Sequence, residues 1–325
     1  MAQNVTLYNL LISCPGDIKE EVALIESAVE EFNELYAEPL GITIKTRHWS
    51  KSSYAQSGGK PQALLNEQFV NKCDAAVAIF WTRFGSPTDE YGSGTEEEIE
   101  MFYQVNLNGT KNLCAGLEKA GVPTNFIFIS TVAVYGMDTG ENISESAELK
   151  GCTPYALSKI HAEQFLQGWC EENSVKLSIL RLPLIAGANP PGNLGAMING
   201  IKRGRYFSIG DADARKSIVM AVDVARLLPA LDGKIGVYNL SDGYDPSFGE
   251  LEMLIARMHG KRKPYSIPLW LARLIARCGD LMGRHAPINS YKLDKIVKPL
   301  TFSSKKAQTE LGWKPLRVLD NFKIS

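Results

Sequence analysis

Residues 126–136 are Phe-Ile-Phe-Ile-Ser-Thr-Val-Ala-Val-Tyr-Gly, and this stretch decides the fold of the chain. Its opening apolar run is typical of a strand that is buried on both faces of a parallel sheet. Ser130 and Thr131 follow at the carboxyl end of that strand, the edge at which open α/β sheets bind their ligands. The stretch therefore predicts a layered α/β fold and also the place of its site.

Strands and helices alternate along the chain around this stretch. Helical spacing predicts helices over residues 18–36, 61–73, 95–119 and 155–170, and clustered Gly and Pro predict a loop over residues 187–195. This alternation predicts a doubly wound, Rossmann-like parallel sheet, followed from about residue 197 by a smaller α+β part. The apolar runs predict strands over Val5–Cys14, Ile42–Trp49, Asp74–Trp81, Phe126–Ser130 and Lys176–Leu182.

Tyr155 and Lys159 stand four residues apart at the start of a predicted helix, so both project from one of its faces. A neighbouring ammonium group favours the phenolate and lowers the pKa of a tyrosine, which suits proton abstraction from an alcohol during hydride transfer. The alternative is an ordinary solvated helix face, because Tyr and Lys are both common there.

Two further motifs frame this pair. Residues 105–110 are Val-Asn-Leu-Asn-Gly-Thr, and residues 181–187 are Arg-Leu-Pro-Leu-Ile-Ala-Gly. With Ser130-Thr131 and the Tyr-Lys pair, these motifs keep the order and spacing of the NAD-dependent epimerase/dehydratase family, the extended short-chain dehydrogenase/reductases. Residues 102–325 resemble that family.

The resemblance implies an oxidoreductase that uses NAD or NADP on a nucleotide sugar. It makes Thr131 the hydroxyl that hydrogen-bonds the substrate oxygen, Tyr155 the general acid/base, and Lys159 the group that holds the nicotinamide ribose and tunes Tyr155. It also implies a homodimer, in which helices around 105–116 and 155–165 pair. The implied cofactor contacts are Asn106, Ser130, Tyr155, Lys159 and Pro183, and the implied diphosphate contacts of the substrate are Asn193, Arg205 and Arg215.

Charge divides the chain near residue 100. Residues 1–100 hold 16 acidic and 7 basic residues (−9), whereas residues 101–325 hold 20 and 28 (+8), giving the net charge of −1. The acidic segment lacks the GxGxxG or GxxGxxG turn with which such enzymes bind the pyrophosphate, a loss that would impair cofactor binding. We therefore expect a chimeric chain, with segments 1–100 and 101–325 of different lineage, joined naturally or artificially.

The acidic segment resembles a bacterial TIR-like domain, distantly similar to nucleoside deoxyribosyltransferases. Residues 13–17, 57–61, 74–81 and 92–99 carry that resemblance, which places Glu98 where the latter enzymes use a glutamate on an N-glycosidic carbon. The alternative function is thus a nucleotide-processing or sensing module with an inactive epimerase scaffold. A glutamate-rich first turn favoured by the helix dipole would explain Glu98 equally.

The remaining composition excludes several classes. Six scattered cysteines without metal-ligand spacing predict free thiols and no metal site, and the first residues lack a secretory signal, so we expect a cytoplasmic protein. The near-zero net charge suggests no nucleic-acid partner. The apolar run Ile267–Gly283 contains Arg273, Arg277 and Asp280 and is too short and too charged to span a membrane; it predicts a packed amphipathic helix or, alternatively, one on a membrane surface.

Overall fold

A single parallel sheet forms the centre of the computed structural model, which describes residues 5–13, 19–48, 75–78, 100–187, 190, 192–282 and 289–323. Its six strands lie in the order β10-β6-β4-β3-β1-β2, and every neighbouring pair is parallel. The expected α/β class with a parallel sheet is confirmed. The strands are β1 (Thr6–Ser13), β2 (Ile42–Arg47), β3 (Ala75–Ala78), β4 (Asn125–Thr131), β6 (Lys176–Leu182) and β10 (Gly236–Asn239).

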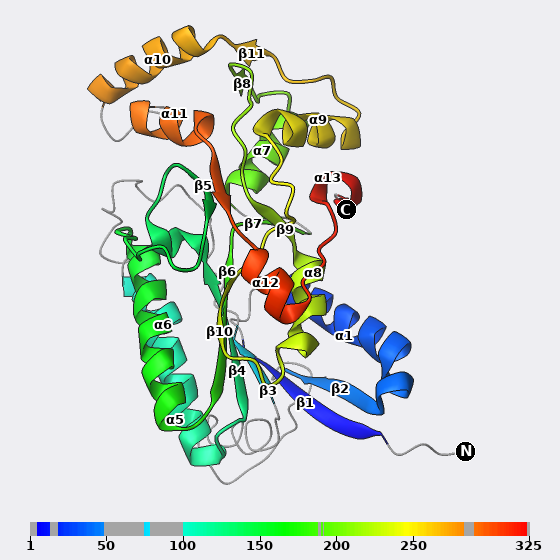
Figure 1. Cartoon of the computed structure of the whole chain (residues 1–325). Coiled ribbons are helices and arrows are strands. Elements are labelled where there is room, and N and C mark those ends of the chain that lie inside the picture. The colour runs from blue at the N-terminus through cyan, green and yellow to red at the C-terminus, as the bar shows by residue number, and fades with distance from the viewer. Residues whose placement is uncertain are drawn as a thin grey trace.

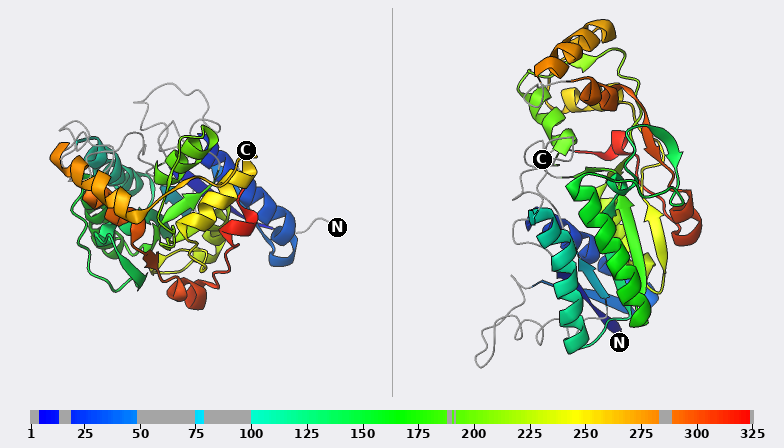
Figure 2. Two further views of the ribbon diagram at one scale, coloured as in Figure 1. Left: turned by 90° about the horizontal axis from the view of Figure 1, so that it is seen from above. Right: turned by 90° about the vertical axis from the view of Figure 1, so that its left-hand side faces the viewer.

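Helices cover both faces of this sheet (Figures 1 and 2). On one face lie α5 (Gly109–Ala120) and α6 (Pro154–Glu172), and on the other lie α1 (Lys19–Leu40), α8 (Ala221–Leu227) and α12 (Lys305–Leu311). Because the helices bury the sheet from both sides, strands such as β4 are apolar along nearly their whole length.

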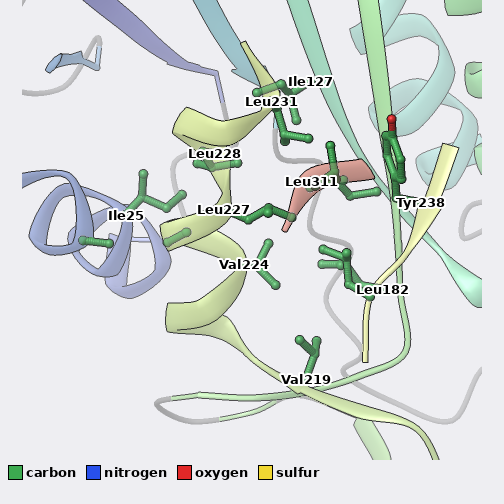
Figure 3. Close-up of a cluster of buried hydrophobic side chains, with 14 of the residues drawn as sticks. Ile25, Ile127, Leu182, Val219, Val224, Leu227, Leu228, Leu231, Tyr238 and Leu311 are labelled. Atoms are coloured by element: carbon green, nitrogen blue, oxygen red, sulfur yellow. The ribbon is translucent and has the colours of Figure 1, made fainter. Parts of the chain in front are cut away.

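One hydrophobic core joins the two oppositely charged segments of the chain. Figure 3 shows Ile25 of α1 in one cluster with Leu227 of α8, Leu182 of β6 and Leu311 of α12. The backbone of β3 also pairs with β4, with Ala75 opposite Asn125. Strands from both sides of residue 100 therefore share one sheet and one core.

The C-terminal part lies beyond the carboxyl ends of the central strands, with α10 at the far end of the molecule (Figure 1). Three short parallel strand pairs and several helices build it. The pairs are β7 (Leu184–Ala186) with β9 (Ile218–Met220), β8 (Ser208–Ile209) with β11 (Ser266–Ile267), and β5 (Gly140–Ile143) with β12 (Leu300–Phe302). The helices are α7 (Gly192–Lys202), α9 (Phe248–Met258), α10 (Leu269–Met282), α11 (Ser290–Val297) and α13 (Val318–Asn321).

Two predicted elements differ in the structure. The helix expected over residues 95–119 contains a π-helical turn, η2 (Tyr103–Asn108), before α5 begins. The loop expected over residues 187–195 was wrong at its end, because α7 begins at Gly192. A Cβ atom at Gly195 would collide with the carbonyl oxygen of Pro190, so this glycine permits a close packing of the helix instead of breaking it.

None of the described helices combines the length and the hydropathy needed to cross a bilayer.

Candidate active site

Helix α6 carries Tyr155 and Lys159 to the carboxyl end of β4. The helix starts immediately before Tyr155, because the Thr153 hydroxyl caps it by accepting from the Ala156 amide at 3.2 Å and a proline occupies its first turn. Lys159 then donates from Nζ to the carbonyl oxygen of Ile129 in β4, at 3.1 Å. This bond ties the first turns of α6 to the edge of the sheet.

Thr131 lies at the same edge. It is the last residue of β4 and caps the short helix η3 (Val132–Tyr135), where its hydroxyl accepts from the Ala133 amide at 3.2 Å. Thr131 and Tyr155 are half-buried, whereas Lys159 is buried. The structure thus brings the three predicted catalytic residues to one end of β4, with the two hydroxyl-bearing residues reached by solvent.

Burial controls the charge of Lys159. Its side chain is 2% exposed, and its Nζ lies 4.9 Å from the centre of the Phe128 ring. This burial lowers the pKa of Lys159 to about 7, although the nearby Glu163 carboxylate opposes the shift. Lys159 therefore holds its proton much less tightly than an exposed lysine does.

Asn106 lies in the π-helical turn, packed against α6. Its Nδ2 donates to the Ser158 hydroxyl at 2.9 Å, while its Oδ1 is buried and accepts no hydrogen bond from the residues that the structure describes. The ring of Phe102, just before this turn, lies 5.6 Å from that of Tyr155. A buried amide oxygen without a partner is costly, and π-turns occur frequently at functional sites, so Asn106 offers a spare acceptor near Tyr155.

A buried polar network beneath the site was not predicted. The Ser130 hydroxyl donates to Glu163 of α6, and Arg181 of β6 donates to the same carboxylate at 2.6 Å. Arg181 also donates to the Tyr135 hydroxyl at 3.1 Å, and that hydroxyl donates to Asn239 at 2.7 Å. Two features of the sequence could have indicated this network: Glu163 repeats the four-residue spacing of Tyr155 and Lys159, and Arg181 is a charged residue inside an apolar strand.

The other predicted contacts lie at or beyond the end of β6. Pro183 joins β6 to β7 and is half-buried. Asn193 is exposed in the first turn of α7, and Arg205 is exposed shortly after its end. Arg215 is exposed too, and its Nη1 donates to the carbonyl oxygens of Tyr244 and Asp245, at 3.2 and 2.9 Å.

Glu98 and the sequences nearest to a phosphate-binding turn, residues 14–17 and 92–98, lie outside the described residues. The part of the site that would hold a pyrophosphate therefore stays a prediction. Within the described ranges, no group of three or more His, Cys, Asp or Glu side chains could hold a metal ion. Cys114, Cys152, Cys170 and Cys278 are free thiols.

The part of the chain that contains these residues is similar in sequence to a known protein family. Residues 91–236 match the NAD dependent epimerase/dehydratase family. That stretch contains Asn106, Thr131, Tyr155 and Lys159 and ends in β10.

Two curated relatives of this epimerase/dehydratase type match over about two thirds of their length. The chain is 27% identical over 220 residues to N-acetyl-alpha-D-glucosaminyl-diphospho-ditrans,octacis-undecaprenol 4-epimerase of Escherichia coli O157:H7, covering 64% of this chain and 66% of the relative. It is 26% identical over 232 residues to UDP-glucose 4-epimerase of Vibrio cholerae, covering 69% of this chain and 68% of the relative.

The fold itself extends over nearly the whole chain. The structure of UDP-glucose 4-epimerase from Bifidobacterium longum in complex with NAD+ and UDP superposes with a TM-score of 0.64, at 20% identity, over 97% of this chain and 95% of that one. The N-terminal segment is thus included in an epimerase-like fold. Its expected resemblance to a TIR-like domain receives no support from these comparisons.

Proposed function

We propose that the protein is an NAD(P)-dependent epimerase or dehydratase that acts on a nucleotide sugar. The observation that carries the proposal is the meeting of Thr131, Tyr155 and Lys159 at the carboxyl end of β4. The match of residues 91–236 and the two relatives support the same class of reaction.

The chemistry divides a hydride and a proton between two acceptors. When bound, NAD(P) would supply the acceptor for a hydride that leaves a carbon of the sugar. Tyr155, as phenolate, takes the proton of the hydroxyl on that carbon, and the Thr131 hydroxyl hydrogen-bonds the same oxygen. Lys159 supports this step in its ammonium form, because a positive charge one helical turn away lowers the pKa of a phenol. The Thr131 oxygen accepts from the Ala133 amide, and this bond does not use the hydroxyl hydrogen. That hydrogen therefore remains available to donate to the substrate oxygen.

The described residues fit the nicotinamide end of the cofactor. The buried Oδ1 of Asn106 has no hydrogen-bond partner among the residues that the structure describes, and Tyr155 and Lys159 stand one turn apart on the neighbouring helix α6. We propose that these residues, with Ser130 and Pro183, hold that end. The residue that would select NAD or NADP belongs to residues 1–100, so the proposal covers both cofactors.

For the substrate we propose a diphosphate held by Asn193, Arg205 and Arg215. Guanidinium groups bind phosphate oxygens through paired, charge-assisted hydrogen bonds, and Arg205 and Arg215 are both exposed. By their names, the Escherichia coli relative acts on a sugar that is attached to a polyprenol diphosphate, and the Vibrio cholerae relative acts on a sugar that is attached to a nucleoside diphosphate. The shared chemistry is a sugar diphosphate, so turnover assays should offer both carriers.

The test compares wild type with Tyr155→Phe. Calorimetry should detect NAD(H) binding by both proteins. Turnover of a UDP-sugar, a GDP-sugar or a polyprenol-diphosphate sugar, whichever the wild type accepts, should fall about 10²–10⁴-fold in the variant, because the general base is lost. Tyr36→Phe, an exposed tyrosine on α1, is the matched control and should keep full turnover. Absence of NAD(H) binding at millimolar cofactor, or full turnover by Tyr155→Phe, would overturn the proposal.

The alternative function rests on the Gly-Thr-Glu-Glu-Glu-Ile sequence at residues 94–99. It assigns the activity to Glu98 and leaves the epimerase-like region as a scaffold. Release of nicotinamide from NAD during the binding experiment, abolished by Glu98→Gln, would favour this alternative. Intact NAD after long incubation would count against it.

A further inference from the structure

Helix α10 turns its large apolar side chains toward solvent. Trp270 is 69% exposed, Leu274 is 53% exposed and Ile275 is 42% exposed, whereas the residues that α10 buries include Ala272 and Ala276. These two alanines lie in one small cluster with Leu293 of α11. A helix on a globular protein normally buries its large apolar residues, so the orientation of α10 is reversed.

Two exposed aromatic rings adjoin this helix. Phe207 and Tyr265 directly precede the paired strands β8 and β11, and the Ser208 amide donates to the Tyr265 carbonyl oxygen at 2.9 Å, so the two rings leave the chain side by side. Phe207 is 56% exposed and Tyr265 is 81% exposed. Strand β11 leads within two residues into α10 (Figure 1). We call Phe207, Tyr265, Trp270, Leu274 and Ile275 the α10 surface.

Helix α10 itself carries positive charge on the α10 surface. Arg273 and Arg277 share the helical stripe of Trp270 and Leu274, since these residues follow the i, i+3, i+4, i+7 spacing. The nearest acidic residue along the helix, Asp280, accepts from the amide and hydroxyl of Ser290, at 2.9 and 2.6 Å. Between residues 253 and 279 the chain has no Asp or Glu and six exposed basic residues: Arg257, Lys261, Arg262, Lys263, Arg273 and Arg277.

We propose that the α10 surface docks onto an anionic phospholipid bilayer and lies in its interface. An exposed helical face with Trp, Leu and Ile between arginines matches the composition of helices that bind such interfaces, and each basic residue adds attraction to anionic headgroups. With 14 residues, α10 is shorter than the roughly 20 needed to span a bilayer. Docking at this surface is independent of the proposed enzymatic function.

Charge argues for a bilayer over a second copy of the chain. In a twofold dimer through this surface, Arg273 and Arg277 of both copies would lie in the same interface. Like charges brought together in this way repel, whereas anionic headgroups would neutralise them.

The test is sedimentation of the full-length protein with lipid vesicles. Wild type should bind vesicles of phosphatidylglycerol mixed with phosphatidylcholine and should bind pure phosphatidylcholine far more weakly. Trp270→Ser/Leu274→Ser should weaken this binding at least about tenfold. Arg273→Gln/Arg277→Gln should weaken it about fivefold for each charge, because a basic residue near the surface contributes about 1 kcal/mol. Leu35→Ser/Ile235→Ser removes two equally exposed apolar residues elsewhere and should leave binding unchanged.

A measurement on the wild type guards against variants that fold poorly. Vesicles with brominated acyl chains should quench the fluorescence of the exposed Trp270 on binding, whereas Trp169 and Trp313 are buried, and Trp270→Phe should lose this part of the quenching. Absence of binding to anionic vesicles overturns the proposal. A wild-type dimer that Trp270→Ser/Leu274→Ser converts to monomer, in sedimentation without lipid, overturns it in favour of a second copy.

Discussion

At the scale of single residues, Lys159 shows how burial determines chemistry. Its ammonium group loses solvation in the interior, and the Ile129 carbonyl, the Phe128 ring and the nearby Glu163 carboxylate compensate only in part. The pKa of Lys159 therefore falls to about 7, well below its usual range. Because this pKa is close to neutral pH, Lys159 changes its charge in the pH range in which Tyr155 would act.

This shift predicts a pH-dependent stability. Between pH 7 and about 10.5 the unfolded chain binds a proton at Lys159 that the folded chain does not, so this residue makes stability rise with pH there, and it adds no pH dependence below that window. Lys159→Met lacks this effect. From pH 7 upward, the free energy of unfolding of wild type should therefore rise relative to that of the variant, by up to about 1.4 kcal/mol per pH unit. Urea denaturation at several pH values gives the free energy of unfolding of both proteins.

Lys216 provides the matched control for this prediction. Burial lowers the pKa of Lys216 to about 8, so the free energy of unfolding of wild type should rise relative to that of Lys216→Met only from about pH 8 upward. If wild type and Lys159→Met keep a constant difference in stability across pH, the assigned charge state of Lys159 is wrong.

At the scale of elements, one buried ion pair fixes α6 against β6. The Arg181 guanidinium lies 2.6 Å from the Glu163 carboxylate, and both side chains are almost fully buried. The same carboxylate accepts from Ser130 at the end of β4. The pair therefore sets how the helix carrying Tyr155 sits over the two strands that end at the site.

Removing one member of this pair should destabilise the fold strongly. Glu163→Leu leaves the Arg181 charge buried without a partner and should lower the free energy of unfolding by about 3–5 kcal/mol. Glu163→Leu/Arg181→Met should recover part of that loss, because the buried Arg181 charge is removed as well. Asp294→Asn, which breaks the exposed pair with Lys298, should cost less than about 1 kcal/mol. A double variant no more stable than Glu163→Leu would contradict this account.

At the scale of the whole molecule, the two oppositely charged segments form one sheet and one core. The outer sides of η2, α5 and α6 lie together on one face of it, with the Tyr103 and His161 rings 5.7 Å apart and Lys111 5.6 Å from the Phe165 ring. We propose that this face, which the family resemblance pairs across a homodimer, forms the subunit contact.

This proposal predicts a dimer that one charge can disrupt. Ala115 is exposed on α5, and Ala115→Glu would bury a carboxylate between two copies, so the dissociation constant should rise about tenfold or more. Sedimentation velocity measures this change, and Leu35→Glu on the distant α1 is the control. A wild-type chain that sediments as a monomer at micromolar concentration would reject the dimer.

Local periodicity explains what could be predicted from the sequence alone. Apolar runs and helical spacing placed β4, β6 and α6 within a few residues, and the four-residue spacing put Tyr155 and Lys159 on one helical face. These features depend on residues close together in the chain, which is why a single sequence contains them.

Tertiary contacts decided the rest. The charge of Lys159 depends on its burial against β4, and the network from Ser130 to Asn239 joins residues more than 100 positions apart, so neither is visible in local spacing. For α10, the sequence predicted an amphipathic helix, either packed or on a membrane surface, without saying which side chains would be covered. Packing on α11 covered the face with Ala272 and Ala276, because these small side chains allow the helices to approach closely, and it left Trp270 and Leu274 in solvent.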